Sequence, residues 1–221
     1  MTPCTIQDLY TTEQTIAKEL LESYTYPWEV LPHIGEFIKK LGNTLDSNIF
    51  EEKGENIWIA KDAIVAPTAS INGPCIICSG AEIRHCAFIR GNAIVGEGSV
   101  VGNSTELKNV ILFNSVQVPH YNYVGDSILG YKSHMGAGSI TSNVKADKTL
   151  VVVKAAEEQF ETGLKKFGAM LGDHVEVGCN SVLNPGTVIG KHSNVYPLSM
   201  VRGFVPAHSI YKSKNEVVEK V

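Results

Sequence analysis

The sequence has few aromatic side chains and no strong charge of either sign. Aromatic residues make up 8% of its 221 residues, and the formal net charge is −4 at pH 7. A core of mostly aliphatic side chains is therefore expected. Without a basic excess, binding to nucleic acid or to an anionic lipid surface is not expected, although a local basic pocket could hold a small acidic ligand.

Long apolar runs and a secretion signal are also missing. The N-terminal residues MTPCTIQDLYTTEQ lack a basic segment followed by an apolar one, and no run approaches the roughly eighteen apolar residues of a membrane span. A cytoplasmic protein without membrane contact is therefore predicted. The cysteines are few and odd in number, which favours reduced thiols over a disulfide framework; they are Cys4, Cys75, Cys78, Cys86 and Cys179.

The central part of the chain repeats with a period of six residues. From Ile59 to Leu107 every sixth residue is aliphatic, which neither an amphipathic helix nor a simple strand alternation produces. A unit of six residues cannot bury its own apolar face, so successive units must coil and stack to form a continuous core. The sequence thus predicts an all-β solenoid of parallel strands, with six or seven coils at three units per coil.

The repeat changes its step twice and is interrupted once. The steps from Leu107 to Leu112 and from Val124 to Leu129 are five residues long. Such local irregularities change a corner and re-aim side chains, as bulges do beside active sites. The rhythm then stops for about thirty residues, and this excursion, at about 142–170, is long enough to indicate a functional loop. The alternative is a decorative β-hairpin with KTLVVV as one strand.

Residues 1–56 precede the repeat and are predicted to form an N-terminal helical segment and linker, with the solenoid domain over residues 57–221. The segment EQTIAKELLES has one apolar face, and a second apolar stripe lies between Pro27, near a helix start, and Gly42, a helix stop. We expect these helices to pack over one end of the solenoid and cover its first coil.

A C-x-x-C motif is formed by Cys75 and Cys78. Only His85 and Cys86 could complete a zinc knuckle with it. In the six-residue register the three cysteines take three different positions, so their side chains need not converge. We interpret them as small buried or half-buried thiols and predict no metal site.

Residues 88–143 carry several short motifs at fixed spacings. These are Arg90, the run with Gly102, Asn103, Glu106 and Lys108, the H-x-x-Y-x-G-D motif from His120 to Asp126, and the G-A-G-x-I-T-x-N motif that ends at Asn143. Together they resemble the acetyltransferase domain of the bifunctional enzymes that synthesise N-acetylglucosamine 1-phosphate, which are hexapeptide-repeat acyltransferases. The resemblance implies a left-handed parallel β-helix, a homotrimer with sites between subunits, and acetyl-CoA as the acyl donor.

The chemistry of acetyl transfer fits these residue types. Only a neutral amine attacks a thioester, so a base must remove the ammonium proton. The resemblance assigns His120 as this general base, and Glu106 could hold and help deprotonate the amine. The fixed positive charges of Arg90 and Lys108 would bind a sugar phosphate.

The resemblance implies further contacts to the acceptor and the coenzyme. Tyr123, Asn143 and His134 are expected to contact the acceptor. The residues expected to contact acetyl-CoA are Ala137, Cys179, Pro197 and the loop residue Lys148. Some positions depart from the bacterial pattern: His134 replaces an asparagine, Val144 a tyrosine, Cys179 a serine and Pro197 an alanine.

Several functions remain open at this point. Glucosamine 1-phosphate is the expected acceptor, with galactosamine 1-phosphate or a nucleotide-linked amino sugar next. A γ-type carbonic anhydrase would need three converging histidines, and the seven histidines show no closely spaced pair. The sequence lacks the G-x-G-T-R segment of the nucleotide-binding domain. A catalytically weak or inactive trimeric scaffold or regulatory subunit for a separate nucleotidyltransferase is therefore the alternative function.

Overall fold

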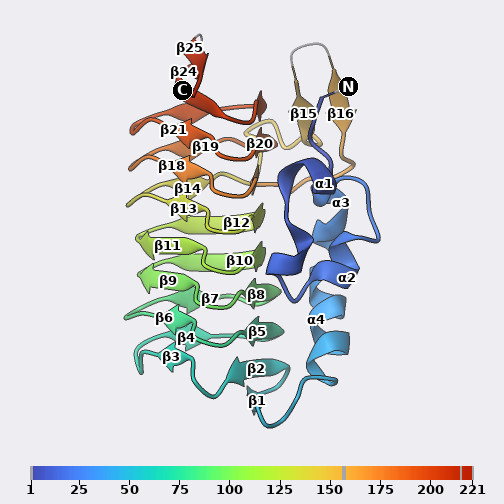
Figure 1. Cartoon of the computed structure of the whole chain (residues 1–221), viewed down its shortest axis with the longest axis vertical. Helices are drawn as coiled ribbons and strands as arrows, with labels where there is room; N and C mark the ends of the chain where they lie inside the picture. Colours follow the sequence, from blue (N-terminus) through green and yellow to red (C-terminus); the bar gives the residue numbers. More distant parts are fainter. Residues whose placement is uncertain (1, 156–157, 215, 221) are drawn as a thin grey trace.

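The chain folds into a parallel β-solenoid with three faces and a row of helices along one side (Figure 1). The computed structural model describes residues 2–155, 158–214 and 216–220. The first face stacks β2 (Ile57–Ala60), β5 (Cys75–Ile77), β8 (Ala93–Val95), the end of β10 (Glu106–Leu112), the end of β12 (Tyr123–Leu129), β17 (Ala169–Leu171), β20 (Thr187–Ile189) and β23 (Phe204–Val205).

The other two faces follow the same order of coils. The second face stacks β3 (Ile64–Val65), β6 (Glu82–Ile83), β9 (Val100–Asn103), β11 (Gln117–His120), β13 (His134–Met135), β18 (Glu176–Val177), β21 (Asn194–Val195) and β24 (Ser209–Ser213). The third face stacks β4 (Ser70–Ile71), β7 (Phe88–Ile89), the starts of β10 and β12, β14 (Ile140–Thr141), β19 (Val182–Leu183) and β22 (Met200–Val201). Two antiparallel strands flank the stack, β1 (Phe50–Gly54) beside β2 and β25 (Glu216–Glu219) beside β24.

The six-residue series forms the core of the solenoid, as predicted. Strand registers place each inward residue on the next, with Ile59 opposite Ile77, Ile77 opposite Val95 and Val95 opposite Leu112. From Ile77 onward the inward residues are fully or almost fully buried. Because these partners are seventeen or eighteen residues apart, one full coil, each aliphatic side chain packs on its equivalent in the next coil. The predicted hexapeptide-repeat β-helix is confirmed, but the described residues stack eight strands on the first face, so the expected six or seven coils are too few.

The two five-residue steps mark one corner of the solenoid in two successive coils. There β10 and β12 run without a break from the third face to the first, whereas other coils use two separate strands, such as β7 and β8. Asn109 (φ 55°) and Asp126 (φ 48°) turn this corner in the left-handed region, which asparagine and aspartate tolerate better than most residues. The shortened steps therefore bring two polar side chains to the same corner.

The N-terminal helices lie along the first face rather than over one end of the solenoid (Figure 1). They are α1 (Ile6–Leu9), the 3₁₀ turn η1 (Thr12–Gln14), α2 (Lys18–Leu21), α3 (Pro27–Val30), the 3₁₀ turn η2 (Leu31–His33) and α4 (Ile34–Gly42). Helix α4 contacts β5, β8 and β10, and the backbone N–H of Asp173 donates to Leu9 O at 3.0 Å. The expectation that the helices cover mainly the first coil is therefore wrong.

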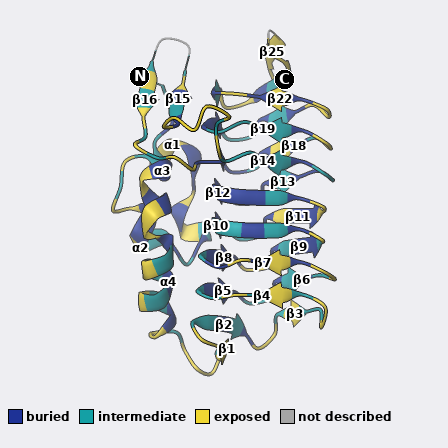
Figure 2. Cartoon of the chain, turned by 180° about the vertical axis from the view of Figure 1, so that it is seen from behind, coloured by how far each residue is buried: buried dark blue, intermediate teal, exposed yellow. Residues whose placement is uncertain are grey.

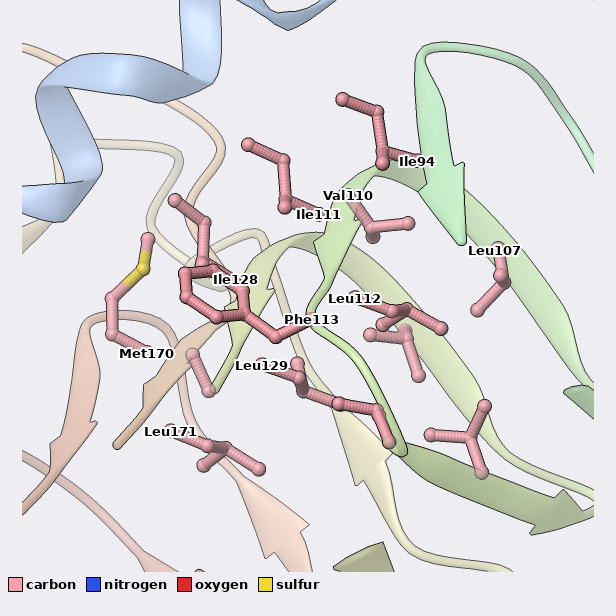
Figure 3. Packing of buried hydrophobic residues seen from close by; sticks show 14 of the residues in the cluster. Ile94, Leu107, Val110, Ile111, Leu112, Phe113, Ile128, Leu129, Met170 and Leu171 are labelled. Atoms are coloured by element: carbon pink, nitrogen blue, oxygen red, sulfur yellow. The ribbon is translucent and has the colours of Figure 1, made fainter. Parts of the chain in front are cut away.

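The helices pack on the first face because this face carries a second series of apolar side chains, which point away from the core. The residue before each inward residue is apolar there, and from Ile76 to Val188 it is fully buried; Figure 3 shows Ile94, Ile111, Ile128 and Met170 among these. On the second face the equivalent residue is Ile64, Glu82 or Gln117, and none of these is buried. Figure 2 shows a similar contrast with the third face, where β4 and β7 are partly exposed while β5 and β8 of the first face are buried. A face that is apolar on both sides needs a cover.

The excursion forms a β-hairpin that packs on its own chain. Its strands are β15 (Val152–Lys154) and β16 (Gln159–Glu161), so KTLVVV does contribute a strand. Phe160 lies with its ring centroid 5.3 Å from that of Tyr26 and 5.8 Å from that of Trp28. The hydroxyl of Thr2 donates to the Glu158 carboxylate at 2.6 Å. The hairpin therefore extends the helical cover of the first face.

None of the helices that the structure describes is long and apolar enough to cross a membrane.

Candidate active site on the third face

Four of the predicted site residues occupy one column along the corner between the second and third faces. His120, Ala137, Cys179 and Pro197 each follow an inward residue by two positions. Backbone hydrogen bonds join their coils: Gly138 N–H donates to His120 O at 3.0 Å, Asn180 N–H to Ala137 O at 2.9 Å, and Leu198 N–H to Cys179 O at 2.9 Å. Neighbouring coils lie about 4.8 Å apart, so this column, named the corner column here, is a continuous strip beside His120.

A buried asparagine holds the backbone of His120. The His120 N–H donates to Asn122 Oδ1 at 3.1 Å, and the Asn122 amide donates to Gly136 O at 2.9 Å and to Ser139 O at 3.0 Å. Asn122 is 2% exposed, whereas His120 is exposed. The imidazole is thus presented to solvent from a fixed backbone, where a neutral ring nitrogen can accept a proton. Asn122 received no role from the sequence, although it lies within the H-x-x-Y motif.

The outward side of the third face carries the side chains that are predicted to bind the amine and the phosphate of the acceptor. Glu106 and Tyr123 stand side by side on β10 and β12. Arg90 Nη1 donates to Glu106 Oε1 at 2.7 Å, and this hydrogen bond raises the pKa of the Arg90 guanidinium. Both side chains remain partly exposed, at 44% for Arg90 and 31% for Glu106. A phosphate can therefore approach the guanidinium from solvent.

Asp126 connects the residues at the opposite corner, between the third and first faces. Its carboxylate is almost fully buried and accepts hydrogen bonds from Asn109 Nδ2 at 3.0 Å and from Asn143 Nδ2. Lys108 Nζ lies 3.5 Å from Asp126 Oδ2. The sequence included Asp126 in a motif without giving it a role, and the structure shows it positioning Lys108 and Asn143.

Tyr123 belongs to the same hydrogen-bonded cluster as Asp126 and Asn143. Asn143 Nδ2 donates to the Tyr123 hydroxyl at 3.2 Å. Burial raises the pKa of the Tyr123 phenol, and the negative charges of Asp126 and Glu106 raise it further. The phenol thus stays protonated near neutral pH and keeps its O–H available as a donor to a bound molecule.

Two predicted residues lie apart from this group. His134 stands on the second face between Gln117 and Glu176, and its Nδ1 is 2.8 Å from Glu176 Oε2. Lys148 is exposed in a turn of the excursion, where its backbone N–H donates to Lys145 O at 3.0 Å. The structure therefore brings together Arg90, Glu106, Lys108, Tyr123 and Asn143, with the corner column at the edge of the same face.

The buried thiols of the C-x-x-C motif agree with the sequence interpretation. Burial raises the pKa of Cys75 and of Cys78 to about 12, so both are thiols at neutral pH. Cys86 is expected to be buried or half-buried as well, but it is exposed at a corner of the solenoid, with Sγ 3.2 Å from His85 Nε2. Within the described ranges of the chain, no group of three or more His, Cys, Asp or Glu side chains is placed to hold a metal ion.

Three histidines are close in space, contrary to the sequence interpretation. His174, His192 and His208 stack at the corner between the first and second faces, with ring centroids 4.7 and 5.0 Å apart. Their separations of 18 and 16 residues are close to one full coil, so the period of the solenoid predicts this proximity. Spacing along the chain alone is the wrong criterion in a repeat protein.

The stacked histidines are expected to make stability depend on pH. Burial lowers the pKa of His192, and the nearby His174, His208 and Lys220 lower it further, against an opposite effect of Asp173. The unfolded chain therefore takes up this proton first as the pH falls below about 6.5. We expect the free energy of unfolding to fall between about pH 7.5 and pH 5, and to fall less in His192→Asn.

Denaturant unfolding at several pH values measures this difference. Asparagine is a suitable replacement because His192 has a φ of 58°, which asparagine tolerates. An equal decline in the wild type and in His192→Asn would show that the stacked imidazoles do not cause the pH dependence.

The chain is similar in sequence to a known domain family and to several bifunctional proteins. The family model of the GMPPB C-terminal domain matches residues 71–213. The bifunctional protein GlmU of Methanococcus maripaludis is 32% identical over 195 residues, which are 87% of this chain and 47% of that protein. The bifunctional sugar-1-phosphate nucleotidylyltransferase/acetyltransferase of Sulfurisphaera tokodaii is 32% identical over 176 residues, which are 80% of this chain and 43% of that protein. The chain spans about half the length of these curated relatives.

Solved structures of acetyltransferases are similar at low identity. The polySia specific acetyltransferase NeuO is 12% identical, with a TM-score of 0.45 over 76% of this chain and 88% of that one. A mutant of GDP-perosamine N-acetyl transferase from Caulobacter crescentus, in complex with CoA and GDP-perosamine, is 16% identical, with a TM-score of 0.32 over 73% of this chain and 54% of that one.

Proposed function

The chain belongs to the family of the GMPPB C-terminal domain, and from this membership and the geometry of the third face we propose that it transfers the acetyl group of acetyl-CoA to an amino-sugar 1-phosphate. Glucosamine 1-phosphate is the acceptor that we put first. The relatives named above as GlmU and as a sugar-1-phosphate nucleotidylyltransferase/acetyltransferase support an acetyl transfer in sugar-phosphate metabolism.

The corner column is the observation that carries this proposal. It begins at the exposed His120 and continues through Ala137, Cys179 and Pro197, whose side chains are small or compact. An extended pantetheine arm could lie along such a strip with its thioester beside the imidazole. The acceptor would then sit on the third face, with its phosphate between Arg90 and Lys108 and its amine toward Glu106.

The reaction follows from these positions. The imidazole of His120 accepts a proton from the ammonium group, which frees the nitrogen lone pair. The nitrogen attacks the thioester carbonyl, a C–N bond forms, and the C–S bond then breaks. His120 returns its proton to the leaving sulfur, and the attacking nitrogen releases its second proton to solvent. The products are the N-acetylated sugar phosphate, CoA thiol and one proton. Tyr123 and Asn143 orient the sugar through hydrogen bonds.

We also propose that the site is completed by a second copy of the chain in a homotrimer. Several large apolar side chains are exposed at or beside the corner column: Tyr121 at 61%, Tyr196 at 46%, Leu198 at 79% and Met200 at 62%. Exposed apolar patches of this kind are typical of protein interfaces. A separate nucleotidyltransferase is a further candidate partner, since the Sulfurisphaera tokodaii relative is named as both a nucleotidylyltransferase and an acetyltransferase.

Replacing Arg90 by alanine tests the phosphate contact. Loss of a charge-assisted hydrogen bond of about 1.5–3 kcal/mol is expected to raise the KM for glucosamine 1-phosphate about 10- to 100-fold and to leave the KM for acetyl-CoA unchanged. Initial rates of CoA thiol release at varied concentrations of each substrate measure both constants.

Arg84→Ala is the matched control, because Arg84 Nη2 also donates to a glutamate, Glu82, at 3.0 Å, but on the second face. We expect it to change neither KM. An equal rise of the acceptor KM in both variants would contradict the placement of the phosphate at Arg90.

A further inference from the structure

A second polar pocket lies farther along the corner that carries Lys108. Ser142, Asn184 and Arg202 continue the position of Lys108 in later coils, since each directly follows an inward residue. The excursion folds over them and encloses a volume of about 580 Å³, within the range of small-molecule sites. The other residues that line the pocket are Val144, Lys145, Ala146, Asp147, Val152, Lys154, Gln159 and Pro185.

Two glycines of the coils fix the hairpin against this corner. A Cβ at Gly203 would lie 2.4 Å from the carbonyl oxygen of Lys154, and a Cβ at Gly186 would lie 2.8 Å from Val151 Cγ1. Both glycines have φ near +80°, which other residues rarely adopt. Lys154 is thus held beside the coil of Arg202 by close backbone contact. The wall of the pocket is a packed element of the fold.

The charges that line the pocket are mainly positive. Lys145, Lys154 and Arg202 face a single carboxylate, Asp147. That carboxylate already accepts hydrogen bonds from the Thr149 N–H at 3.0 Å and the Thr149 hydroxyl at 2.8 Å, and it lies 3.3 Å from Lys145 Nζ. Lys154 and Arg202 have no carboxylate partner within 4.0 Å among the residues that the structure describes. In a chain of net charge −4, this pocket therefore has a local excess of positive charge.

The uncharged residues that line the pocket suit a ligand with a base or sugar ring rather than a bare anion. Val144, Val152 and Pro185 provide apolar surface, and Val144 is 44% exposed. Asn184 and Gln159 add amide groups for specific hydrogen bonds. We propose that this pocket binds a nucleoside diphosphate, with its phosphates between Lys154 and Arg202 and its base or ribose against Val144 and Pro185. The inference concerns binding only, so it does not depend on acetyl transfer at the third face.

Isothermal titration calorimetry of the full chain with UDP, GDP and inorganic pyrophosphate measures the three dissociation constants and tests the proposal. We expect UDP or GDP to bind in the micromolar range and pyrophosphate at least tenfold more weakly. Lys154→Ala and Arg202→Ala should each weaken nucleotide binding tenfold or more. Lys165→Ala, an exposed lysine of the same excursion outside the pocket, should bind as the wild type does. Circular dichroism and thermal unfolding confirm that each variant is folded.

Three results would overturn the proposal. The first is that the wild type shows no measurable nucleotide binding at millimolar concentration. The second is that Lys154→Ala and Arg202→Ala bind the nucleotides as tightly as Lys165→Ala does. The third is that pyrophosphate binds as tightly as the nucleotides. Acetyl transfer by Arg202→Ala is a separate readout: its retention with lost nucleotide binding is the expected result. A failure of acetyl transfer in all proteins, with nucleotide binding intact, would contradict the proposed reaction and leave this inference standing.

Discussion

Replacement of His120 by alanine is expected to lower kcat for acetyl transfer about 100- to 10,000-fold, the range for loss of a general base. The imidazole is exposed at the start of the corner column, and its backbone is held by the buried Asn122. Alanine removes the base and leaves this backbone contact in place, so the fold and the KM for acetyl-CoA should change little. Initial rates of thiol release give both constants.

His85→Ala is the matched control for this experiment. His85 occupies the same corner position two coils earlier, is exposed as well, and has its Nδ1 2.7 Å from the Thr68 hydroxyl. We expect it to retain the activity of the wild type. Comparable rates in His120→Ala and His85→Ala would remove His120 from the mechanism, whereas a bell-shaped pH profile lost only in His120→Ala would support its role as the base.

Replacement of Asp126 by asparagine is expected to lower the free energy of unfolding by about 2 kcal/mol. The carboxylate is 4% exposed and accepts hydrogen bonds from two asparagine amides, Asn109 and Asn143, beside Lys108. An amide at position 126 offers one oxygen and adds donors, so one of the two half-buried asparagine amides loses its acceptor and Lys108 loses its counter-charge. The acceptor KM should rise as well, because Lys108 and Asn143 are no longer fixed.

Asparagine suits this test because it keeps the left-handed backbone of Asp126. The effect can therefore be assigned to the carboxylate rather than to backbone strain. Denaturant unfolding measures it, and Asp62→Asn, which changes an exposed aspartate, is the control with an expected change below about 0.5 kcal/mol. Equal stability of the two variants would show that Asp126 does not organise the site.

The solenoid is predictable from the sequence because each inward position makes the same demand in every coil. The aliphatic series from Ile59 to Leu107 and its two five-residue steps correspond to the stacked core and to the corner turned by Asn109 and Asp126. The inward series alone does not predict the cover of the first face. The adjacent apolar positions, such as Ile94 and Ile111, carry that signal.

The site is predictable only where a motif fixes its members. The residues of the short motifs, such as Glu106 and Tyr123, do gather on the third face. The roles of Asp126 and Asn122 depend on hydrogen bonds across coils, which spacing along the chain does not reveal. The same spacing hides the stack of His174, His192 and His208, although the coil length of about eighteen residues predicts it.

Thiol release from acetyl-CoA by the wild-type protein, with a panel of amino-sugar phosphates, tests the central claim most directly. The panel includes glucosamine 1-phosphate, galactosamine 1-phosphate and a nucleotide-linked amino sugar. We predict release that depends on the acceptor and is fastest with glucosamine 1-phosphate, accompanied by an acetylated amine in the product. Absence of acceptor-dependent release with every member of the panel would contradict the account and favour a scaffold or regulatory subunit.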